Sequence, residues 1–63
     1  MEKRINFNIT YKSGKSFSDS TIYIVLDETD LKAAIANFRD GSDGTDVSGI
    51  DYISCWDDEG NEY

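Results

Sequence analysis

The feature that most constrains the fold of this chain is the segment from Asp27 to Gly41, which has helix signals at both ends. Asp27 is a residue type that caps helix N-termini, and the acids Glu28 and Asp30 suit the positive end of a helix dipole. Gly41 readily adopts the left-handed conformation with which helices commonly end. The segment therefore predicts a helix between an N-cap at Asp27 and a C-terminal stop at Gly41.

The apolar residues of this segment fall on one face of the predicted helix. Leu31, Ala34, Ile35 and Phe38 follow the i, i+3, i+4, i+7 spacing of an amphipathic helix. Leu26 precedes the cap and is placed to contact Leu31 as a hydrophobic staple. A three-turn helix with a single apolar stripe needs a partner surface, and we expect that surface to be a sheet.

The residues before the helix predict a β-hairpin. Residues 5–11 alternate between apolar and polar side chains, as in a half-buried strand. Lys12–Lys15 contains a glycine and predicts a tight turn. The chain then returns through Phe17 and Thr21–Leu26, with a polar interruption at Ser18–Ser20 that fits either a bulge or a break between two strands. The apolar side of the first strand consists of Ile5, Phe7, Ile9 and Tyr11.

After the helix, Asp40–Gly49 has nothing to bury and predicts a loop. Ile50–Trp56 resumes strand character with apolar groups on both faces, which suggests an inner strand or one covered by a partner. Ile50, Tyr52 and Trp56 would lie on one face, opposite Ile53 and Cys55.

Asp58–Asn61 has turn chemistry, and Glu62 and Tyr63 then fit a short final strand. We interpret Trp56 as the end of a core strand and the acids after it as a rigid turn. The predicted order is strand, strand, helix, strand. Residues 1–63 therefore predict one α+β domain, a small ββαβ unit with one amphipathic helix packed on a mainly antiparallel sheet.

Composition narrows the possible functions. The chain has 63 residues and no histidine, so it has little volume for a substrate cleft and no ordinary general base near neutral pH. We predict that the protein is not an enzyme and needs no cofactor. Cys55 is the single cysteine, which precludes an internal disulfide, and its place in an alternating strand predicts a small packing residue.

The N-terminal stretch MEKRINFNITYKSG is polar throughout and does not resemble a signal peptide. No apolar run approaches the length needed to span a membrane. These features predict a cytoplasmic protein without a membrane partner.

The charge is large and unevenly distributed. Thirteen acids and six bases give a net charge of −7. Residues 33–63 hold eight of these acids and one base, Arg39, so the whole excess lies in this half. Direct binding to nucleic acid is disfavoured, because neutralising phosphates requires clustered lysines and arginines.

The loop oxygens of Asp40, Ser42, Asp43 and Asp46 are the type of ligand that calcium favours. An EF-hand loop that starts at Asp40 would need glycine at its sixth position, which here is Thr45. The pattern fails at this position, and we predict no metal site. A calcium-binding module remains the third hypothesis, after the two given below.

The acids of the second half form two groups along the sequence, Asp40, Asp43 and Asp46 in the loop and Asp51, Asp57, Asp58, Glu59 and Glu62 after it. Six of these acids are the candidate partner contacts, namely Asp40, Asp43, Asp46, Asp57, Asp58 and Glu59. Trp56 and Tyr63 are possible aromatic anchors beside the second group. One interpretation is a partner-binding surface made by these eight residues. The other is a solvated face, because acids are effective solubilising residues. Against the second interpretation, a solubilising surface usually mixes both signs of charge.

The hairpin "YKSGKSF", the single capped helix and the closing "WDDEGNEY" resemble very small acidic proteins of bacteriophages and other mobile elements, anti-CRISPR proteins among them. The resemblance implies stoichiometric inhibition, in which carboxylates bind a host defence nuclease where it expects nucleic-acid phosphates. It transfers no site residue.

The leading hypothesis is therefore a non-enzymatic inhibitor that binds the basic surface of a nucleic-acid-binding protein or nuclease. The alternative is a structural or assembly module that acts through a sheet edge or through dimer contacts, with a homodimer as one form.

Overall fold

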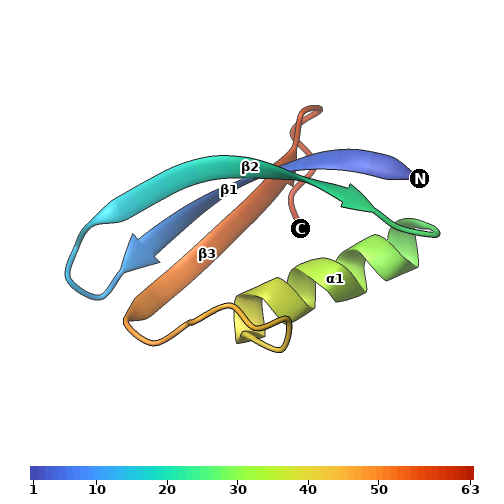
Figure 1. Cartoon of the computed structure of the whole chain (residues 1–63). Coiled ribbons are helices and arrows are strands. Elements are labelled where there is room, and N and C mark those ends of the chain that lie inside the picture. Colours follow the sequence, from blue (N-terminus) through green and yellow to red (C-terminus); the bar gives the residue numbers. More distant parts are fainter.

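The computed structural model describes all 63 residues. It contains the strands β1 (Glu2–Tyr11), β2 (Ser16–Ile24) and β3 (Ile50–Asp57) and the helix α1 (Glu28–Asp40). The strands form one antiparallel sheet in the order β2-β1-β3, and α1 lies on one side of it (Figure 1). The predicted α+β fold with ββαβ order is confirmed. The helix is too short and too polar to cross a membrane.

The hairpin of β1 and β2 is regular along its whole length. Its register runs without a shift from Glu2 opposite Ile24 to Thr10 opposite Ser16. The polar residues Ser18–Ser20 therefore form neither a bulge nor a break. The turn is possible because Gly14 adopts a φ of 91°, a conformation that is costly for residues with a Cβ.

β1 is the central strand, and β3 is at a border of the sheet. Of the two alternatives for Ile50–Trp56, the inner strand is therefore wrong, and a strand covered by a partner stays a prediction. The register of β3 on β1 runs from Asp57 opposite Ile5 to Tyr52 opposite Thr10. A shift then places Ile50 opposite Tyr11, where it packs against the core instead of sharing a face with Tyr52.

The core lies between α1 and the face of β1 and β3 that the helix covers. Its fully apolar centre has six buried residues, namely Ile5, Ile9, Leu31, Ile35, Ile53 and Cys55. The ring of Phe38 on α1 meets that of Phe7 edge-on, with centroids 5.2 Å apart. The residues of β2 contribute little, and all except Tyr23 are exposed.

Both predicted ends of the helix are confirmed. The carboxylate of Asp27 accepts a hydrogen bond from the amide of Asp30 at 2.9 Å, and Gly41 closes the helix with a φ of 81°. The predicted staple does not form, because Leu31 is buried whereas Leu26 is 89% exposed. Instead the amide of Leu26 donates to the side chain of Asp30 at 3.0 Å.

Candidate partner-binding surfaces

The three acids of the loop organise its backbone. Each side chain accepts a hydrogen bond from the amide two residues further on, at 2.8 Å for Asp40, 2.9 Å for Asp43 and 3.0 Å for Asp46. The hydroxyls of Thr45 and Ser48 donate to the same carboxylates, at 2.6 and 2.7 Å. The repeat of an acid every three residues thus follows a series of Asx-turns.

These turns also affect how the loop acids titrate. Hydrogen bonds from the hydroxyl and the amide of the residue two positions on lower the pKa of Asp40, Asp43 and Asp46 below the usual aspartate value. All three residues are exposed. The loop therefore presents three exposed carboxylates that are harder to protonate than an ordinary aspartate.

No group of three or more His, Cys, Asp or Glu side chains is gathered in a way that could hold a metal ion. One oxygen of each loop carboxylate already accepts hydrogen bonds from the turn that it stabilises. Within this loop, a Cβ at Gly41 would lie 2.9 Å from the carbonyl oxygen of Thr45.

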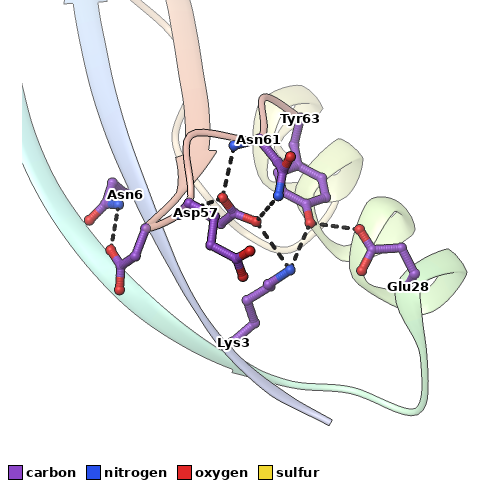
Figure 2. A network of polar contacts seen from close by, with 8 residues as sticks. Lys3, Asn6, Glu28, Asp57, Asn61 and Tyr63 are labelled. Atoms are coloured by element: carbon purple, nitrogen blue, oxygen red, sulfur yellow. Dashed lines mark hydrogen bonds and ion pairs between the residues drawn. The ribbon is translucent and has the colours of Figure 1, made fainter.

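Asp57 differs from the other acids because it is buried, with 1% of its surface exposed. Its Oδ1 accepts the amides of Glu59 at 3.0 Å and Asn61 at 2.8 Å, and its Oδ2 accepts the side-chain amide of Asn61 at 2.8 Å. Lys3 from β1 adds an ion pair at 3.1 Å. Figure 2 shows this network at the end of β3.

The network sets the charge state of both partners. The bonds from Asn61, with further ones from Lys3 and the amide of Glu59, lower the pKa of Asp57 to about 2 despite its burial. Hydrogen bonds to Asp57 and to Tyr63 raise the pKa of Lys3. The pair is therefore fully ionised near neutral pH. Asp57 fixes the C-terminal turn and is not available to a partner, so its predicted place on the acidic surface is corrected.

The two aromatic residues beside this turn lie on opposite sides of the sheet. Trp56 lies near the end of a strand that contributes Ile53 and Cys55 to the core, as predicted. Its own side chain follows the outward alternation of Tyr52 and is half-buried on the face that α1 does not cover. Tyr63 is half-buried, and its hydroxyl donates to Glu28 at 2.6 Å and accepts from Lys3 at 3.3 Å (Figure 2). Tyr63 thus links the C-terminal turn to the start of α1.

Asp58 and Glu59 are exposed at the tip of the C-terminal turn. Asp58 accepts a hydrogen bond from the side-chain amide of Asn6 at 3.0 Å, whereas no polar contact involves the carboxylate of Glu59. The backbone bridge between Trp56 and Glu62 closes the turn and corresponds to the predicted short final strand. The turn is therefore ordered, and its two acids face solvent.

The acidic loop and the acidic turn do not lie side by side. The loop precedes β3 and the turn follows it, so they lie at opposite ends of this strand (Figure 1). The eight residues of an extended strand span about 25 Å. The expectation that they form one continuous patch is wrong. The predicted strand Ile50–Trp56 already stood between the two clusters, and its extended length keeps them apart.

The bases do little to offset the exposed acids. Twelve of the thirteen acids are exposed, since Asp57 alone is buried. Lys3 forms the only ion pair of the structure. Arg39 is directed inward, and its guanidinium donates to the carbonyl of Ile53 at 3.0 Å and to that of Tyr63. The surface is therefore strongly negative, with four exposed bases, namely Arg4, Lys12, Lys15 and Lys32.

Other candidate sites are small. A groove of about 280 Å³ lies between α1 and the C-terminal segment, and one of about 240 Å³ lies between Arg39 and the first half of β3. The first includes Tyr63 and the second includes Tyr52. Cys55 is buried in the core, as predicted, and burial raises the pKa of its thiol, which disfavours the reactive thiolate.

Sequence reasoning missed the contacts that Lys3, Arg39 and Asn61 make. It placed Asn61 in a turn from the turn chemistry of Asp58–Asn61, but it did not predict that Asn61 binds Asp57. Lys3 gave no local signal, since its partner lies 54 positions away. Comparison with protein-family models, curated proteins and solved structures finds no match to this chain.

Proposed function

We propose that this protein is a non-enzymatic inhibitor that binds the basic surface of a nucleic-acid-binding protein and competes there with nucleic acid. A phage-encoded inhibitor of a defence nuclease, of the anti-CRISPR type, is the form that the sequence resemblance suggests. The observation that carries the proposal is the charge imbalance at the surface, where twelve acids but only four bases are exposed. Such a field attracts a basic partner and repels nucleic acid.

The separation of the two acidic clusters refines this proposal. Asp40, Asp43 and Asp46 lie at one end of β3, and Asp58 and Glu59 lie at the other. Each cluster sits in an ordered turn, so little conformational entropy is lost when its carboxylates pair with lysine or arginine. Two clusters about 25 Å apart suit an extended basic groove better than a compact pocket.

The test uses variants that remove charge and keep the turns. Asparagine can replace aspartate in an Asx-turn, so Asp40→Asn, Asp43→Asn and Asp46→Asn neutralise the loop without breaking its hydrogen bonds. Asp58→Asn with Glu59→Gln does the same for the C-terminal turn. Lys12→Gln with Lys15→Gln is the control, because it changes a comparable number of surface charges of the opposite sign.

The immobilised wild-type protein is used to capture partners from bacterial lysate, and the captured protein is then challenged with double-stranded DNA or RNA. We expect nucleic acid to displace the partner, and affinity to fall by at least about tenfold between roughly 50 and 300 mM salt. The neutralised variants should lose capture and the control should keep it. Capture that neither salt, nucleic acid nor neutralisation weakens would contradict charge mimicry.

A further inference from the structure

The outer edge of β2 is open along its whole length. The amide of Tyr11 donates to Lys15 at 2.8 Å and that of Val25 to Met1 at 2.9 Å, so odd-numbered residues of this hairpin bond across it. The even-numbered residues of β2 therefore direct their N–H and C=O groups away from β1. These residues are Ser16, Ser18, Ser20, Ile22 and Ile24. Of their five amides, one is bonded, from Ser20 to the Asp19 side chain at 2.8 Å.

The opposite border of the sheet is protected. The carbonyl of Ile53 on β3 accepts the Arg39 side chain at 3.0 Å, and the carbonyl of Cys55 accepts the amide of Tyr63 at 3.0 Å. The amide of Asp57 also donates to Asn61 at 2.9 Å. β3 therefore has an internal cover, which leaves β2 as the exposed edge of this sheet.

β2 also lacks the features that usually prevent edge strands from pairing. It has no proline, no lysine or arginine, and no bulge, and Asp19 is its one charged residue. It is apolar at several exposed positions, with Phe17 50%, Ile22 54% and Ile24 81% accessible. An edge strand of this kind is suited to pairing with another strand.

We propose that β2 pairs in antiparallel fashion with β2 of a second copy of this chain, about a two-fold axis at Ser20. This register pairs all nine residues of the strand and joins the outward groups of Ser18 with those of Ile22 in the other copy. At the axis, Ser20 exchanges its bond to Asp19 for the Ser20 carbonyl of the second copy. The two sheets become one sheet of six strands.

The side chains fit this register. On the side of the helices, Phe17 lies opposite Tyr23 of the second copy, an aromatic pair of the type that stabilises sheets. Asp19 lies opposite Thr21, a hydroxyl donor. Moving the axis to Asp19 would set two aspartates directly against each other, which is unfavourable.

The charges near the two ends of β2 favour a second copy of this chain as the molecule that pairs with it. Exposed Lys12 and Lys15 lie in the turn that precedes β2, and neither belongs to an ion pair. Asp27, Glu28 and Asp30 follow the other end of the strand. Antiparallel pairing brings the basic turn of each copy beside the acidic helix start of the other, twice in the dimer. This contact offsets the repulsion expected between two molecules of charge −7.

The dimer does not depend on the proposed inhibitor function, because it leaves the loop acids and the C-terminal turn exposed.

Sedimentation equilibrium of the pure protein from micromolar to millimolar concentration measures dimer formation directly. Amide hydrogen exchange followed by NMR over the same range then locates the interface. We expect exchange at Ser16, Ser18, Ile22 and Ile24 to slow by about tenfold or more as the dimer forms. The odd-numbered amides are already protected by β1 and should change little.

Two variants sharpen the test. Ser18→Pro removes one outward amide that β1 does not use, and should raise the dimer dissociation constant by at least about tenfold, whereas Ser18→Ala should not. If Ser18→Pro does not fold, Lys12→Glu with Lys15→Glu weakens the same dimer through charge without altering β2. A monomer at all concentrations, or a dimer in which these amides stay unprotected, overturns the proposal, as does pairing of β2 with a different protein only.

Discussion

Four aspartates, Asp40, Asp43, Asp46 and Asp57, accept a hydrogen bond from the backbone amide two residues further on. Three of them keep their carboxylates at the surface, and Asp57 is buried with Lys3. The same residue type thus has two roles, and burial decides between them. Asp40, Asp43 and Asp46 therefore both order the backbone of their loop and give its surface a negative charge.

Replacing Asp57 tests its role in the fold. Asp57→Asn places an amide next to Asn61 and Lys3, where only donors are present, so one buried acceptor is lost. We expect the melting temperature to fall by about 10 °C. Asp58→Asn is the matched control, since Asp58 is exposed with a single contact to Asn6, and it should change melting by no more than about 2 °C. Equal melting of the two variants would contradict the assigned role.

The lowered pKa of Asp57 predicts how the stability of the fold depends on pH. This pKa falls from 3.8 in the unfolded chain to about 2 in the folded protein, so the folded state binds this proton less readily. The stabilisation is complete above the unfolded value and is lost as the pH falls from about 4 towards 2. Urea unfolding across this range should show a steeper loss for wild type than for Asp57→Asn. Parallel curves would mean that Asp57 does not titrate in this way.

At the scale of elements, the loop between α1 and β3 is ordered by its own side chains. Asp43 accepts both the amide and the hydroxyl of Thr45. Asp43→Ala removes these bonds, and we expect the amide of Thr45 to exchange about tenfold faster with solvent. Asp43→Asn keeps an acceptor in the same place and should leave exchange within about twofold of wild type. Faster exchange in both variants would indicate that charge, and not the turn, orders the loop.

β3 depends on elements that are distant in the sequence. Its register on β1 sets Asp57 and Cys55 on the helix side and Trp56 on the uncovered side. Its outer edge is closed by Arg39 from α1 and by the C-terminal segment. β2 has no such cover, and this difference between the two borders is the basis for the proposed dimer.

The whole molecule carries a net charge of −7 on a small surface, with both ends of β3 acidic. Repulsion between these charges opposes folding, and salt screens it. We expect the melting temperature to rise by about 3–5 °C from roughly 10 to 150 mM NaCl. The variant with Asp40→Asn, Asp43→Asn and Asp46→Asn should rise less. A melting temperature that falls with salt would show that attractive ion pairs dominate instead.

The sequence by itself determined the helix, its two caps, the hairpin and the α+β class. Each of these depends on periodicity or on hydrogen bonds that span a few residues, such as the contact of Asp27 with Asp30. Tertiary structure alone decided that β1 is central and that Asp57 is buried. These facts depend on the pairing of β1 with β3, and Lys3 meets Asp57 across 54 positions with no local pattern to indicate it.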